Sequence, residues 1–256
     1  MSRTIRLSDH FTYGSLLRFT LPSIVMLVFT SIYGVVDGYF VSNFVGKTAF
    51  AAVNFIMPFL MILGCAGFMF GTGGGALIAK TMGEGDTEKA NRIFSEVIWF
   101  SCLSGVGLAV LGQLLLQPAA RVLGAEGQML EQCVAYGRII LAAIPAYVLQ
   151  YEFQCLFVTA EKPKLGLYVT VAAGLTNVVL DAVFVALLSW GVLGAAAATA
   201  LSQCVGGILP LLYFIAPNSS RLRIVPTKFH RGTLLKVCLN GSSELMSNIS
   251  MSLVGM

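Results

Sequence analysis

The sequence predicts an all-α integral membrane protein with six membrane-spanning helices and the start of a seventh. Of its 256 residues, 57% are hydrophobic and only 11% are charged, whereas soluble domains carry about 25% charged residues. The apolar runs are continuous and about 20 residues or longer, the length that a helix needs to cross a bilayer. A membrane barrel would instead alternate apolar and polar residues over strands of about 10 residues. Helices are therefore expected throughout.

The six predicted spans follow one another with short polar connections. A further helix starts near Thr233 and is still running at Met256. The predicted spans cover residues 19–45, 48–79, 97–117, 134–160, 165–188 and 192–216. Polar residues at 80–92, together with Pro118 and the 124–127 stretch, are read as loops.

The distribution of Lys and Arg supports both the number of spans and their orientation. If the N-terminus is cytoplasmic, only Lys47, Arg121 and Arg138 of the 16 basic residues fall on the outer side. Cytoplasmic loops are enriched in Lys and Arg, so this distribution fits six alternating spans. We expect residues 1–217 to form a six-helix lobe, 218–232 a basic cytoplasmic linker and 233–256 the start of helix seven. Because the sequence stops within a hydrophobic helix, we also expect a piece of a longer protein.

Two carboxylates lie deep within predicted spans. Asp37 is in the second half of span one and Asp181 in the second half of span five, with Asn177 four residues earlier on the same helix face. Spans one and five run in the same direction, so the two carboxyl groups are expected at similar depth. A charged side chain at mid-bilayer costs about 2.5–3.5 kcal/mol and is usually kept for function. The cluster could share a proton, bind a monovalent cation, or serve only as a polar contact between helices.

Two further acidic residues have less certain places. Glu152 in span four could face a cavity or reach toward the inner interface, and Glu244 lies early in span seven. Both are candidate cavity residues. No catalytic triad, zinc motif or ATP-binding motif is present, so we expect neither an enzyme nor a primary pump, and no cofactor.

Five motifs, in order and on the matching spans, resemble the multidrug and toxic compound extrusion (MATE) family, most closely its MepA-like bacterial branch. They lie at residues 36–42, 80–86, 159–164, 177–181 and 194–199. The resemblance implies the N-lobe of a twelve-helix, two-lobed transporter of the bacterial inner membrane, a monomer when full length. It implies export of cationic, often aromatic drugs in exchange for Na⁺ or H⁺, with no nucleic-acid partner.

The same resemblance implies roles for particular residues. The family's N-lobe cation site maps to Asp37, Asn177, Asp181 and Thr199, which would be Na⁺ ligands if Na⁺ is the coupling ion. Pro22 matches a proline linked to bending of helix one. Two alternatives stay open: a lipid-linked oligosaccharide flippase of the same superfamily, or a non-transporting membrane fragment. The flippase would be expected to place basic residues in its cavity, whereas the deep charges here are acidic.

Overall fold

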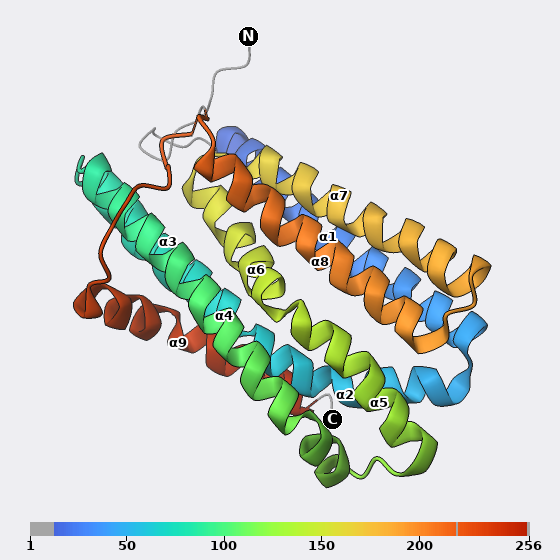
Figure 1. The fold of residues 1–256 in the computed structure, drawn as a ribbon. Coiled ribbons are helices and arrows are strands. Elements are labelled where there is room, and N and C mark those ends of the chain that lie inside the picture. Colours follow the sequence, from blue (N-terminus) through green and yellow to red (C-terminus); the bar gives the residue numbers. More distant parts are fainter. Residues whose placement is uncertain (1–12, 219, 255–256) are drawn as a thin grey trace.

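The described residues of the computed structural model are 13–218 and 220–254, and every regular element among them is a helix (Figure 1). Arg3 and Arg6, which we expect on the cytoplasmic side, lie outside the described residues. The elements are α1 (Tyr13–Phe40), η1 (Val41–Val45), α2 (Lys47–Gly64), α3 (Ala66–Gly83), α4 (Thr87–Leu123), α5 (Gly127–Ala142), α6 (Ile144–Thr159), α7 (Pro163–Asp181), η2 (Ala182–Leu187), α8 (Gly191–Ile215) and α9 (Arg231–Val254).

The predicted set of six spans is confirmed. Five stretches of the described chain are long and apolar enough to cross a membrane, and α5 with α6 makes a sixth if this bent pair is one span. Span two comprises α2 and α3, which together cover Lys47–Gly83. The expected helix after the linker is α9, which begins at Arg231.

Two expected loops are mostly helical. Pro118 lies inside α4, which continues to Leu123 and ends at Gly124, where φ is 106°. The polar stretch at 80–92 contains the end of α3 and the start of α4, and Asp86 caps α4 by accepting a hydrogen bond from the Lys89 N–H at 3.0 Å. Polarity marked where the chain leaves the apolar region, but a capped helix can extend well beyond it.

Span four is broken near its middle. Helices α5 and α6 meet at an angle of 59° around Ala143, and Pro145 lies in the first turn of α6. Proline lacks an N–H and is favoured at the first positions of a helix, so it suits a restart here. The bend lets α5 pack on α2 while α6 packs on α3 and α4.

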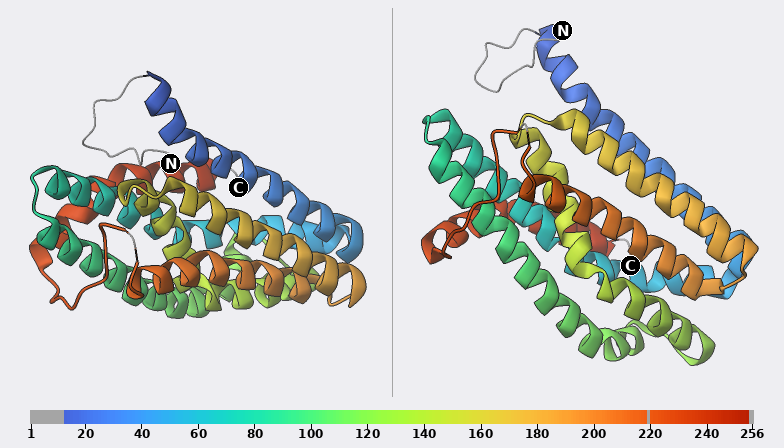
Figure 2. Two further views of the ribbon diagram at one scale, coloured as in Figure 1. Left: turned by 90° about the horizontal axis from the view of Figure 1, so that it is seen from above. Right: turned by 45° about the horizontal axis from the view of Figure 1, so that its top comes forward.

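Helix α6 lies between two groups of helices (Figures 1 and 2). On one side α1, α7 and α8 run side by side, and on the other α3 and α4 form a pair. The α3–α6 contact is close because glycines face α6: a Cβ at Gly67 would lie 2.4 Å from the carbonyl oxygen of Val148. The bundle thus has two halves that share one central helix.

The segment between α8 and α9 is extended and is attached to α4. The N–H of Arg223 donates to Asn91 Oδ1 at 2.9 Å, and the N–H of Val225 donates to Ser95 Oγ at 2.8 Å. Leu222, the residue just before Arg223, is fully buried. The basic linker therefore lies along the surface of the lobe, and it leads into α9, which packs against α3.

Candidate functional site

Asp37 and Asp181 come together where α1 packs on α7. Their carboxyl groups interact directly across this interface. Asp181 is fully buried and Asp37 half-buried, yet Asp37 Oδ1 and both Asp181 oxygens have no well-formed hydrogen bond within the protein. Two deep carboxyl groups thus face one another with oxygen atoms available to a ligand.

The helix contact that brings them together is made by a glycine. Gly174 lies two turns before Asp181 on α7, and a Cβ there would lie 2.9 Å from Tyr33 Cδ1 and 2.6 Å from Phe29 Cε1. Tyr33 is one turn before Asp37 on α1. Because small residues allow helices to approach closely within membranes, this contact sets the spacing of the carboxyl pair.

Asn177 and Thr199 carry the other polar atoms of the site predicted from the sequence. Asn177 is 1% exposed, and neither its amide oxygen nor its nitrogen has a hydrogen-bond partner in the protein. It is one turn before Asp181 and shares its face of α7. Thr199 Oγ1, from the adjoining helix α8, is also buried and without a partner.

Tyr136 joins this cluster, although sequence reasoning did not select it. Its side chain is 1% exposed, its hydroxyl lies beside Thr199, and both Asp37 and Asp181 act on it electrostatically. The hydroxyl has no well-formed hydrogen bond in the protein. A tyrosine within an apolar span resembles any packing aromatic in the sequence, so only the path of α5 beside α8 reveals it.

Both carboxylates lie beside π-helical turns. Asp181 is the last residue of α7 and η2 follows it directly, while Asp37 lies one turn before η1. The two π-helical turns contact each other. Such turns are rare and occur often at functional sites, because they displace backbone groups from regular pairing. The sequence gives no signal for them.

Aromatic rings surround the neighbouring part of α1 and α6. Tyr33 faces Gln150 and Tyr151 of α6 as well as Asp37. The hydroxyl of Tyr147 donates to that of Tyr151 at 3.1 Å, and the ring of Tyr151 lies 4.1 Å from that of Phe68, centroid to centroid. These rings are only partly buried, so an aromatic surface adjoins the carboxyl pair.

The remaining candidates lie away from this cluster. Pro22 is inside α1, where it removes the N–H that would bond to the carbonyl of residue 18. Glu152 is fully buried between α6 and the α3–α4 pair, so it does not extend to the inner interface. Glu244 is exposed on α9.

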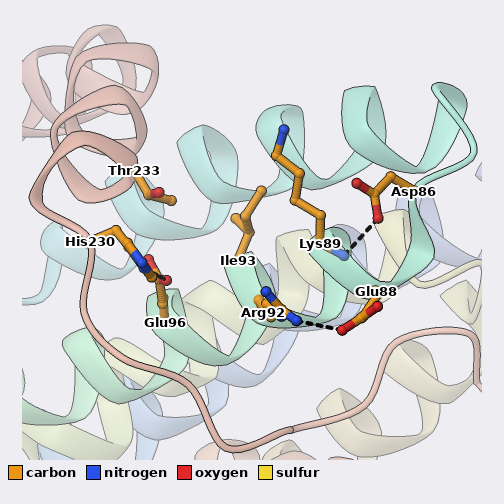
Figure 3. Close-up of a pocket in the computed structure, with 8 residues that line it drawn as sticks. All are labelled: Asp86, Glu88, Lys89, Arg92, Ile93, Glu96, His230 and Thr233. Atoms are coloured by element: carbon orange, nitrogen blue, oxygen red, sulfur yellow. Dashed lines mark hydrogen bonds and ion pairs between the residues drawn. The ribbon is translucent and has the colours of Figure 1, made fainter.

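A separate pocket of about 370 Å³ lies at the turn between α3 and α4, beside the linker (Figure 3). There His230 Nδ1 lies 2.6 Å from Oε1 of the buried Glu96, and Arg92 pairs with Glu88. Its lining is a mixture of acidic and basic groups, and it is remote from the carboxyl pair. Among residues 13–218 and 220–254, no three His, Cys, Asp or Glu side chains converge on a metal-binding point.

Comparison with known proteins decides the family. The MatE family model matches residues 22–183, which include most of α1, all of α2 to α7 and both carboxylates. The chain belongs to the MatE family. This agrees with the resemblance drawn from the motifs.

MatE relatives match nearly the whole chain. The multidrug export protein MepA of Staphylococcus haemolyticus is 26% identical over 208 residues, covering 81% of this chain and 46% of MepA. MepA of Staphylococcus saprophyticus is 24% identical over 248 residues, covering 95% and 54%. The chain therefore spans about half the length of these curated relatives.

The fold is also that of solved transporters. A MOP superfamily transporter from Pyrococcus furiosus superimposes with a TM-score of 0.87 at 24% identity, covering 96% of this chain and 57% of that one. That transporter is described as having a binding pocket of reverse polarity, which suggests a different function for it. The six-helix bundle thus has the fold of the corresponding part of that transporter.

Proposed function

We propose that the full-length protein is a multidrug efflux antiporter, which exports cationic and aromatic compounds in exchange for Na⁺ or H⁺. The cation site would be formed in the N-lobe by Asp37, Asn177, Asp181 and Thr199. The observation that carries this proposal is the set of buried polar atoms, from three helices, that lack protein partners. Buried polar groups are nearly always satisfied, so such a cluster suits a ligand.

The chemistry of the cluster suits a small hard cation or a proton. Carboxylate, amide and hydroxyl oxygens are the ligands that hard cations prefer. The Tyr136 hydroxyl would add one more oxygen from α5. Two facing carboxylates repel each other when both are ionised, and one bound Na⁺ or H⁺ would relieve this repulsion.

The transport cycle follows from the placement of these groups on separate helices. Binding of the cation from outside would draw α1, α7 and α8 together, with Pro22 as the point at which α1 bends. The drug must bind more weakly in the cation-bound, outward-facing state, because a ligand shifts a conformational equilibrium only through differential affinity. Asp37 would link the two events, because its carboxyl group is part of the proposed cation site and also faces Tyr33, one of the neighbouring aromatic rings.

The proposed cargo follows from the surface beside the site. Tyr33, Tyr147, Tyr151 and Phe68 offer partly exposed rings, and cations are attracted to aromatic faces. The deep charges are acidic, which suits a cationic drug more than the pyrophosphate of a lipid-linked oligosaccharide. The flippase alternative would require basic groups in this region.

The proposal concerns the whole transporter. The second lobe, of which α9 would be the first helix, is expected to close the other side of the drug cavity. The protein would be a monomer in the bacterial inner membrane with its N-terminus in the cytoplasm. The 256-residue chain alone is expected not to transport.

The test is drug efflux from cells that express the full-length protein with Asp37→Asn or Asp181→Asn. Efflux of a cationic dye should fall to the level of cells without the transporter, while Glu126→Asn, at an exposed position next to α5, should leave it unchanged. Wild-type efflux from both aspartate variants would overturn the proposed site. Transport of a lipid-linked oligosaccharide but no dye by the wild type would favour the flippase.

A further inference from the structure

Glu152 of α6 is a further buried carboxyl group, separate from the candidate cation site and from Glu96, which is paired with His230. Its side chain is 0% exposed, and neither Oε1 nor Oε2 has a well-formed hydrogen bond within the protein. No ion pair to it is formed among residues 13–218 and 220–254. Burial of an unpaired carboxylate in an apolar interior is highly unfavourable, so this group needs a compensating partner.

The groups packed directly against Glu152 come from α3 and α4. On α3, a Cβ at Gly71 would lie 3.0 Å from the Cα and the carbonyl oxygen of Glu152, so the two backbones are in direct contact. On α4, the fully buried Ser101 hydroxyl lies beside the carboxyl group, and Cys102 is the next residue. Ser101 Oγ also lacks a well-formed hydrogen bond.

The next turn of α6 connects Glu152 with α9. Cys155 faces both Glu152 and Glu244, and Glu244 is exposed. The titratable groups facing Glu152 are therefore Cys102, Cys155 and, beyond Cys155, Glu244. None of these can supply a positive charge.

Glu152 points away from the side of α6 that faces α1, the helix of Asp37. Gln150, two residues earlier, faces Tyr33 of α1. Residues two positions apart on an α-helix are related by a rotation of about 200°, so their side chains lie on nearly opposite faces. Glu152 accordingly faces α3 and α4, whereas Gln150 faces α1, which holds Asp37, and α8.

We propose that Glu152 is a proton-binding site, distinct from the Asp37–Asp181 pair, that holds a proton while α6 is packed on α3 and α4. A protonated carboxyl group carries one O–H donor and keeps acceptor capacity, which suits the neighbouring Ser101 hydroxyl. Movement of α6 away from the α3–α4 pair would admit water and favour release of the proton. The site therefore links protonation to the packing of the two halves of the N-lobe, whichever ion the Asp37–Asp181 pair takes.

Infrared spectroscopy of the purified protein tests this directly, because a protonated carboxyl group gives a C=O stretching band that a carboxylate lacks. The Asp37→Asn/Asp181→Asn double variant removes the other buried pair. At neutral pH this double variant should retain a protonated-carboxyl band that shifts in D₂O. Adding Glu152→Gln should abolish the band, while adding Glu131→Gln, an exposed residue of α5, should leave it intact.

Further variants keep the test independent of transport. Ser101→Ala should shift the band, because the adjoining hydroxyl is lost. In a separate measurement, Glu152→Gln should unfold at the same temperature as the wild type. Absence of a protonated-carboxyl band in the Asp37→Asn/Asp181→Asn variant would overturn the proposal, even if Glu152→Gln fails to fold. Persistence of the band after Glu152→Gln would overturn it as well. Neither result depends on whether Asp37 supports drug efflux.

Discussion

Gly174 of α7 lies against the ring of Tyr33 of α1, so closely that a Cβ at position 174 would be 2.9 Å from Tyr33 Cδ1. This contact holds α1 and α7 together below the Asp37–Asp181 pair. A larger side chain at 174 would separate the helices and pull the carboxyl groups apart.

We therefore predict a graded response at Gly174. Gly174→Ala should be tolerated, because the ring edges of Phe29 and Tyr33 can move slightly. Gly174→Leu should reduce cation-driven efflux at least tenfold in the full-length protein, measured in cells with matched expression. Gly107→Leu, on an open surface of α4 where a Cβ meets no atom within 4 Å, is the control. Equal efflux by the two leucine variants would contradict the role given to this contact.

The α3–α9 contact should be far less tolerant. A Cβ at Gly73 would lie 2.0 Å from the carbonyl oxygen of Val237, and a Cβ at Gly241 would lie 2.0 Å from that of Met69. Backbone atoms cannot move aside as ring edges can. Gly73→Ala should destabilise the packing of α9 by about 1–3 kcal/mol, the usual cost of overpacking.

Thermal unfolding of the purified protein measures this effect. Gly83→Ala serves as the control on the same helix, since a Cβ at Gly83 meets nothing within 4 Å. The Gly73 variant should unfold at a lower temperature and the Gly83 variant close to the wild-type value. If both behaved alike, α9 would not be held as the structure describes.

The attachment of the linker to α4 rests on two side chains that accept backbone hydrogen bonds. Asn91→Ala and Ser95→Ala remove the acceptors for the N–H groups of Arg223 and Val225, and each bond contributes about 0.5–1.5 kcal/mol. The double variant should expose the linker, so trypsin should cleave at Arg221, Arg223 or Lys228 several times faster.

A matched control for the linker is Ser42→Ala, because the Ser42 hydroxyl bonds only to a nearby carbonyl and to Asn43 within η1. Its tryptic rate should equal that of the wild type. An unchanged rate in the Asn91→Ala/Ser95→Ala protein would show that other contacts, such as the burial of Leu222, hold the linker.

Tyr136 should contribute to the cation site through its hydroxyl group. Tyr136→Phe keeps the ring and removes the oxygen beside Thr199. If that oxygen contacts the bound cation, the loss is about 1.5 kcal/mol, or roughly tenfold in the cation concentration needed for half-maximal efflux. Tyr213→Phe, whose ring packs on Phe214 away from the site, should show no change.

Much of the fold follows from the sequence because hydrophobicity and charge act over whole helices. Long apolar runs predict the spans, and the distribution of basic residues supports their number. The ends and breaks of the helices are harder to predict. Pro118 is expected in a loop but lies within α4, because this helix extends beyond its apolar region. The bend at Ala143 lets α5 pack on α2 and α6 on α3; Pro145 suits the restart of the helix, but one apolar run over 134–160 still predicts a single span.

The candidate site divides in the same way. Asp37 and Asp181 could be selected because charge is rare within spans, and Asn177 because of its spacing from Asp181. Tyr136 could not be selected, because its place in the site depends on α5 packing against α8. The surroundings of Glu152 depend on the rotation of α6, and the sequence left this open between a cavity and the inner interface.

The central claim is that the Asp37–Asp181 pair binds the coupling cation. Its most direct test uses the full-length protein in liposomes, with imposed Na⁺ and H⁺ gradients varied separately and movement of a cationic drug followed. One gradient should drive drug movement in the wild type, and neither should drive it in the Asp37→Asn or Asp181→Asn protein, although both variants should still insert and fold. Gradient-driven transport at the wild-type rate by either variant would contradict the claim.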